Sequence, residues 1–90
     1  MSQAIVNPGE LRRFAQTLKK FNSELSDQMN RLANQLADLS NTWRDQEQLK
    51  FREEFEQHMT MIARFIEANN LHIPYLLRKA ERIEEYIQQR

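Results

Sequence analysis

The sequence predicts an all-α protein: a helical hairpin of two long antiparallel helices that associates as a four-helix bundle dimer. Apolar residues recur at helical spacing over residues 11–39 and again over residues 49–87. The 90 residues include only one Gly and two Pro, which leaves little for the tight turns of a sheet. A short polar run at residues 40–42 separates the two periodic segments and marks the turn between them.

Charge balance and residue content exclude several classes of function. Thirteen basic and thirteen acidic residues leave no net field that would attract nucleic acid. No apolar run is long enough to span a bilayer, and the N-terminus lacks the basic segment and apolar core of a classical signal peptide. Without Cys, the chain has neither disulfides nor thiolate chemistry. Any export is therefore expected to use a non-classical route.

The first helix is predicted over residues 8–39. Asn7 can cap it, and Pro8 suits its first position because the N–H that proline lacks would be unpaired there in any case. Leucines recur at every seventh residue, and the interleaved positions are mostly apolar, with Asn22 as a polar member that would control the register of a bundle. The repeating leucines are Leu11, Leu18, Leu25, Leu32 and Leu39.

The second helix is predicted over residues 44–88, after a turn at residues 40–43. Thr42 is expected to cap it with the help of Asp45. Asn69 again places a polar side chain in an apolar stripe, and Pro74 is expected to kink the helix because it lacks a backbone donor. Residues before the first helix are expected to form a short arm. A length of 90 residues predicts a single domain.

Folding the chain near residue 42 predicts which residues oppose one another. Both helices rise about 1.5 Å per residue, so Leu36 should face Leu49 and Leu11 should lie near Ile73. Residues 75–90 would then extend past the start of the first helix, and their apolar side chains would need a partner elsewhere. The expected partner-binding and export tail consists of Tyr75, Leu76, Ala80, Ile83 and Ile87.

A lone hairpin of this size buries little apolar surface, so association is expected. The partner would be a second copy, giving a homodimer, or a related helical hairpin, giving a heterodimer. An antiparallel dimer would bury an apolar face made of phenylalanines from both helices. The expected dimer face consists of Phe14, Phe21, Phe51 and Phe65.

No catalytic site, cofactor or metal is expected. His58 and His72 lie roughly 20 Å apart along one helix edge, too far apart to share a metal ion. No Glu stands three residues before either histidine, which excludes the carboxylate–histidine pattern of di-iron bundles. The chain has no Gly-rich phosphate loop, and in the expected hairpin no serine has a histidine near it.

Trp43 is the only tryptophan and stands at the turn, followed by Arg44 and Asp45. It could close the end of the bundle, or it could form a recognition surface with its neighbours. A chain near 100 residues with two amphipathic helices and a Trp at the turn resembles the WXG family of early-secreted-antigen-like proteins, which type VII secretion systems export. Trp43-Arg44-Asp45 stands where the family has Trp-x-Gly, and Phe51 and Phe55 also resemble the family's second helix.

The resemblance implies a non-enzymatic secreted effector, adaptor or chaperone-like protein that is cytoplasmic before export. A secretion ATPase or an effector would be among its partners. In the family, the turn Trp forms a surface with the partner's C-terminal tail, and many tails carry Tyr-x-x-x-Asp/Glu. Here Lys79 follows Tyr75 at that spacing, and Arg90 follows Tyr86.

The unbroken leucine repeat also supports a second interpretation, an intracellular coiled-coil interaction module. In that arrangement residues 8–39 form a parallel leucine zipper and the chain does not fold back on itself. The two interpretations differ in the separation of Leu18 and Ile66, which are near each other in a hairpin and tens of ångströms apart in an extended zipper.

Overall fold

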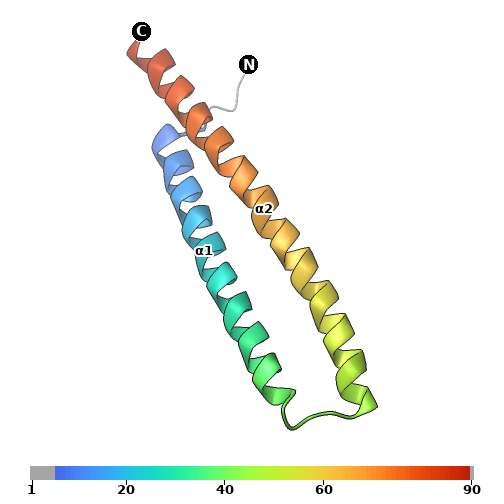
Figure 1. Ribbon diagram of the computed structural model, residues 1–90. Coiled ribbons are helices and arrows are strands. Elements are labelled where there is room, and N and C mark those ends of the chain that lie inside the picture. The colour runs from blue at the N-terminus through green and yellow to red at the C-terminus, as the bar shows by residue number, and fades with distance from the viewer. Residues whose placement is uncertain (1–5, 90) are drawn as a thin grey trace.

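The computed structural model describes residues 6–89 and shows two long helices folded back on each other (Figure 1). α1 spans Pro8–Leu39 and α2 spans Gln46–Gln88, with a loop at residues 40–45 between them. Most of the expected N-terminal arm, residues 1–5, lies outside the described residues, as does Arg90. Because α1 packs along α2 of the same chain, the extended zipper is wrong and the hairpin is correct.

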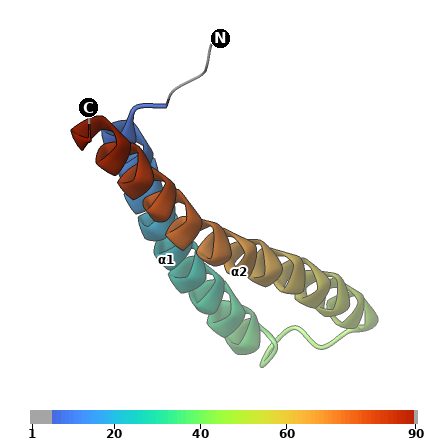
Figure 2. The same cartoon turned by 90° about the horizontal axis from the view of Figure 1, so that it is seen from above.

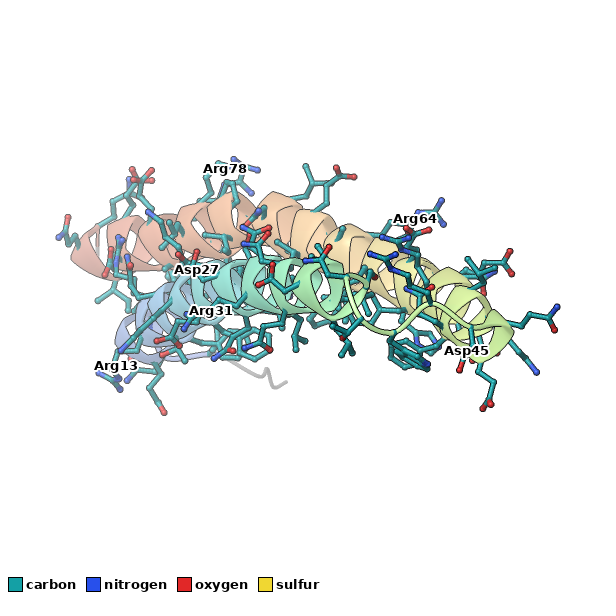
Figure 3. All side chains as sticks on the ribbon, turned by 60° about the horizontal axis from the view of Figure 1, so that its bottom comes forward. Arg13, Asp27, Arg31, Asp45, Arg64 and Arg78 are labelled. Atoms are coloured by element: carbon teal, nitrogen blue, oxygen red, sulfur yellow. The ribbon has the colours of Figure 1, made fainter. Side chains whose placement is uncertain are left out.

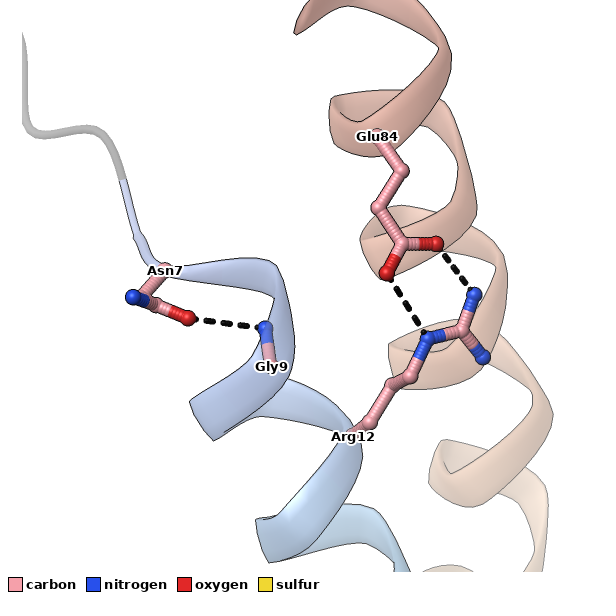
Figure 4. Close-up of polar contacts among 4 residues, drawn as sticks. All are labelled: Asn7, Gly9, Arg12 and Glu84. Atoms are coloured by element: carbon pink, nitrogen blue, oxygen red, sulfur yellow. Dashed lines mark hydrogen bonds and ion pairs between the residues drawn. The ribbon is translucent and has the colours of Figure 1, made fainter.

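α1 begins where the sequence predicts, at a cap formed by Asn7. Its side-chain Oδ1 accepts hydrogen bonds from the backbone N–H groups of Gly9, at 2.8 Å, and Glu10, at 3.1 Å. Asn7 has extended backbone geometry and Pro8 occupies the first helical position, so the donors of the first turn are either satisfied or absent. Figure 4 shows this cap beside the end of α2.

α2 begins two residues later than predicted, and a different residue caps it. Asp45 Oδ1 accepts the Gln48 N–H at 3.0 Å, so Asp45 is the cap itself and not an assistant to Thr42. The Thr42 hydroxyl instead donates to the Leu39 carbonyl at 3.3 Å, at the other end of the loop. Thr42 therefore helps to terminate α1, which explains why it does not start α2.

The two helices are packed tightly only along the half of the hairpin that holds the chain ends. Among residues 6–89, the buried apolar side chains are Ala15, Ile73 and Ala80, all in this half. Two of the three are alanines, whose small side chains let the helix backbones approach closely. Toward the loop the helices diverge (Figures 1 and 2), and a groove of about 320 Å³ opens between them beside Leu36 and Phe55.

The register of the helices differs from the prediction. Leu11 was expected near Ile73, but its neighbour Arg12 reaches Glu84, eleven residues further along α2. Side chains lean toward the N-terminus of their own helix, so in an antiparallel pair Arg12 and Glu84 reach toward each other. The slanted course of α2 in Figure 2 adds to the difference. Ala80 is consequently buried against α1, and only the last turns of α2 extend past α1 in Figure 1.

α2 runs through Pro74 without a break. Proline lacks an N–H, so the carbonyl of Asn70, four residues earlier, has no helical donor. Figure 2 shows that the course of α2 bends along its length. The apolar spacing on either side of Pro74 is kept, so the same face of α2 meets α1 before and after it.

Candidate protein-interaction surface

The interior of the hairpin contains a polar clasp, formed by Asn22, Asn69 and Asn70. Asn22 is only 3% exposed. Its Nδ2 donates to Asn70 Oδ1, and its Oδ1 accepts from Asn69 Nδ2, both at 3.0 Å. Both ends of the buried amide are therefore satisfied, which a shifted register would not allow. The clasp pins one alignment of α1 on α2.

A second polar contact fixes the end of the hairpin where the chain ends lie. The Arg12 guanidinium donates from Nε and Nη2 to the two carboxylate oxygens of Glu84, the Nε bond measuring 3.1 Å (Figure 4). This two-pronged bond lowers the pKa of Glu84 and raises the pKa of Arg12. Both side chains remain about 40% exposed, at 41% and 38%, so water and salt screen the pair.

The lowered pKa of Glu84 predicts an acid-sensitive contribution to stability. Since the folded-state pKa lies below the ordinary Glu value, the contribution is present at neutral pH and is lost as the pH falls through that pKa. Glu84→Gln should melt slightly below wild type at pH 7, and the difference should vanish by about pH 2. Thermal melts followed by circular dichroism test this, with Glu85→Gln as the control. An equal difference at both pH values would contradict it.

At the loop, three aromatic rings pack in series. The ring centroid of Trp43 lies 5.8 Å from that of Phe51, which in turn stacks on Phe55 at 5.9 Å. Trp43 is half-buried, so the indole both covers the end of the hairpin and offers a face to solvent. In this one geometry Trp43 can both close the end of the hairpin and form part of a recognition surface.

The other residues of the turn motif are placed differently from Trp43. Arg44 and Asp45 are exposed, but the Asp45 side chain is already used as the cap of α2. Under the loop, Gln48 is 3% exposed and donates from Nε2 to Ser40 Oγ at 2.8 Å, while Ser40 Oγ donates to the Leu36 carbonyl. This chain of bonds ties the start of α2 to the end of α1.

The four phenylalanines of the expected dimer face are all exposed, by 44–57% of their surface. The structure divides them into two groups. Phe21 and Phe65 meet edge to face across the helix pair at 6.4 Å, and Phe14 lies two turns before Phe21 on α1. Phe51 instead packs beneath Trp43 at the loop. The phenylalanine edge of the hairpin is thus the row formed by Phe14, Phe21 and Phe65.

The expected tail is less free than the sequence suggested. Ala80 is fully buried, and Leu76 and Ile83 are half-buried, because α1 reaches further along α2 than predicted. Tyr75 and Ile87 are exposed. A groove of about 470 Å³ lies along this part of α2 and is lined by Tyr75, Lys79, Arg82, Ile83, Tyr86, Arg78 and Val6.

Sequence reasoning missed Gln48, Asn70 and the pairing of Arg12 with Glu84. Gln and Arg side chains are usually exposed, so the residue types alone did not indicate that Gln48 is buried or that Arg12 is paired. Asn70 follows Asn69 directly, and a tandem Asn opposite a lone polar position in the other helix was the available signal for a clasp. The ion pair could be found only with the correct register.

Within residues 6–89 the structure has neither a cluster of possible metal ligands nor a helix that could span a membrane. In this part of the chain, no three His, Asp or Glu side chains come together in a way that could hold an ion. His58 and His72 are exposed. Neither α1 nor α2 has a stretch apolar enough to cross a bilayer. Charged side chains such as Arg13, Arg64 and Arg78 project away from the helix pair in Figure 3.

The fold and surface define a small helical hairpin with exposed aromatic side chains along one edge and at the loop. Residues 3–86 match the WXG100 model, described as proteins of 100 residues with WXG, and the chain belongs to this family. WXG100 proteins are non-enzymatic secreted proteins associated with type VII secretion. No curated protein matches the sequence.

Solved structures agree with this assignment. Crystal structures of the secreted protein EsxB from Bacillus anthracis strain Sterne resemble the hairpin over nearly its whole length. The selenomethionine-labelled form is 29% identical, with 96% of this chain and 98% of that chain covered and a TM-score of 0.78. The wild-type form is 30% identical, with 93% and 97% covered and a TM-score of 0.77. A single-residue variant is 29% identical, with 94% and 96% covered and a TM-score of 0.81.

Proposed function

We propose that this protein is a type VII secretion substrate that acts by binding other proteins, as an effector, adaptor or chaperone-like partner. It associates with a second helical hairpin in a four-helix bundle, through the phenylalanine edge. The loop with Trp43 and the exposed part of the tail are then offered to the export machinery. The observation that carries the proposal is the large apolar surface that a folded hairpin leaves uncovered.

The accessible surface supports association quantitatively. The hairpin exposes 7435 Å², whereas a compact monomer of its 10.9 kDa mass would expose about 5,600 Å². The excess is larger than the roughly 800 Å² that each partner contributes to a standard protein–protein interface. Part of it is the edge where Phe14, Phe21 and Phe65 stand beside one another. A partner hairpin laid along this edge would complete the core.

The aromatic cluster at the loop supports a recognition role for the turn motif. Trp43 rests on Phe51, so its indole is held in one place without being fully covered. Rigid, partly exposed aromatic rings make effective binding anchors because little conformational entropy is lost on binding. The Asp45 cap fixes the loop next to it. Type VII partners would therefore recognise a preformed surface.

Export from the native host tests the proposed function. Wild type should appear in the culture supernatant without a cytosolic marker, and Trp43→Ala should reduce its export at least tenfold while keeping wild-type helicity. Leu71→Ala is the matched control, because Leu71 is 75% exposed and lies away from the phenylalanine edge, the loop and the tail groove. Strict retention of the wild type in the cytosol would refute the proposal. Normal export of Trp43→Ala would show that the loop is not needed for export.

A further inference from the structure

One groove of the hairpin gathers three cations that no carboxylate balances. This groove, the tail groove, has a volume of about 470 Å³ and lies along the last third of α2. Its charged lining consists of Arg78, Lys79 and Arg82, and no Asp or Glu among residues 6–89 lines it. The sole ion pair in this part of the chain joins Arg12 to Glu84, so the cations of the groove have no carboxylate partner there. The tail groove is therefore a local, uncompensated positive charge.

Helical spacing concentrates these three charges into about one turn of α2. Arg78 and Arg82 stand four residues apart with Lys79 beside them, so together they span about 6 Å of the helix axis. Like charges at this spacing repel each other and destabilise a helix, and a bound anion removes that cost. Glu81 and Glu85 on the adjoining row are exposed but lie beyond ion-pair distance. A cluster this compact suits a phosphate group, which carries its charge on a few adjacent oxygens, better than carboxylates spread along a peptide.

An aromatic ring lines the tail groove on each side of the cation cluster. Tyr75 is 53% exposed and Tyr86 is 64% exposed. Each stands about one helical turn, roughly 5–6 Å along the axis, from the nearest cation. The apolar side chains of Val6 and Ile83 complete the lining. An exposed aromatic ring is a surface on which a nucleobase can stack. The groove thus offers two such surfaces, each one turn away from a site for phosphate.

We propose that the tail groove binds a nucleotide: the phosphates lie on the three cations, and the base stacks on one of the two tyrosine rings. The volume of the groove is sufficient, since small-molecule sites measure about 300–1,000 Å³. The described lining holds no Asn, Gln, Asp or Glu that could read the edge of a particular base, so the site is expected to accept different bases. The inference goes beyond the proposed function and does not depend on it, because every lining residue belongs to one hairpin.

Titration of the ¹⁵N-labelled protein with ADP, without divalent metal, tests the proposal by nuclear magnetic resonance. Saturable changes in chemical shift should be confined to residues 75–87 and to Val6. Adenosine and inorganic pyrophosphate should each bind at least about tenfold more weakly than ADP, because each carries only one of the two groups that the groove recognises. A peptide of glutamates tests whether spread carboxylates suffice, and it should bind more weakly than ADP as well.

Removing two of the cations tests the phosphate half of the site. The Lys79→Gln, Arg82→Gln double variant should bind ADP roughly 30-fold more weakly than wild type, because two charge-assisted contacts are lost. The matched control is Lys19→Gln with Lys20→Gln, which removes the same charge from exposed side chains outside the tail groove and should leave ADP binding unchanged. Circular dichroism establishes that both variants keep their helices.

Removing the two rings tests the base half of the site. The Tyr75→Leu, Tyr86→Leu double variant should bind ADP about tenfold more weakly than wild type, because stacking on the base is lost. Its affinity for pyrophosphate should be unchanged, since the cations are intact. This difference separates a stacking role for the rings from a purely structural one.

Four results would overturn the inference. Wild type might show no shift changes with about 10 mM ADP, which would exclude the site. Pyrophosphate binding as tightly as ADP would leave an anion site that does not recognise a base. Tighter binding of the glutamate peptide than of ADP would make the occupant an acidic peptide. An equal loss of ADP binding in the Lys19→Gln, Lys20→Gln control would reduce the effect to overall charge. Trp43-dependent export is unaffected by any of these results and is tested separately.

Discussion

Replacing Phe65 with serine is expected to dissociate the proposed four-helix bundle while leaving the hairpin folded. About half of the Phe65 side chain is exposed in the isolated hairpin, so association would bury roughly 100 Å² of it, worth about 2.5 kcal/mol. In a symmetric dimer the substitution removes one ring from each protomer, so the loss of binding free energy is doubled. The doubled loss corresponds to a Kd raised by roughly 1,000-fold or more. Sedimentation equilibrium over a wide concentration range measures this directly.

The control for Phe65→Ser must separate lost association from lost folding. Leu71→Ser introduces the same polar group on α2 at a position that is 75% exposed and lies outside the phenylalanine edge, so it should leave the Kd unchanged. Far-ultraviolet circular dichroism should show that both variants keep their helices, because about half of the Phe65 side chain already faces solvent in the hairpin. A Phe65→Ser protein that dimerises as tightly as wild type would remove this edge from the interface.

The fold was predictable because its signals are local. The seven-residue repeat of leucines in α1 and the Asn7-Pro8 start depend only on neighbours in sequence, and the structure places α1 accordingly. The loop was harder to predict, because Thr42 and Asp45 can each form hydrogen bonds at the end of the first helix or at the start of the second. The competition was decided by the Thr42 hydroxyl, which bonds the end of α1 and leaves the cap of α2 to Asp45.

The interaction surface was predictable only in part, because it depends on register. Counting residues from the turn treats the helices as parallel rods, and it misses both the divergence of the helices near the loop and the lean of side chains toward their own N-terminus. In the structure Ala80, which was expected to need a partner, is already buried within the hairpin. The exposed phenylalanines were easier to predict, because the wide apolar face of each helix can be recognised in the sequence without knowing how the two helices align.

The polar clasp should give the second large effect. Asn22→Ala removes both hydrogen bonds of a buried side chain and leaves a small cavity, which should cost about 1–3 kcal/mol of unfolding free energy. We expect the loss of unfolding free energy to lie at the lower end of this range, because Asn70 is exposed and can form a hydrogen bond to water instead. For a domain of this size such a loss is a substantial fraction of the total stability. Urea denaturation followed by circular dichroism at several protein concentrations measures it and separates unfolding from dissociation.

Replacing both Asn22 and Asn69 with leucine should have the opposite effect on stability and should expose what the clasp is for. Two apolar side chains at the interface of α1 and α2 add burial, so the denaturation midpoint should rise. The register, however, would then be held by apolar contacts that several alignments can make. Spin labels on cysteines introduced at Leu18 and Ile66 should give a narrow distance distribution in the parent hairpin and a broad one in the double-leucine variant. A distribution that stays narrow would show that packing alone fixes the register and that the clasp is dispensable for it.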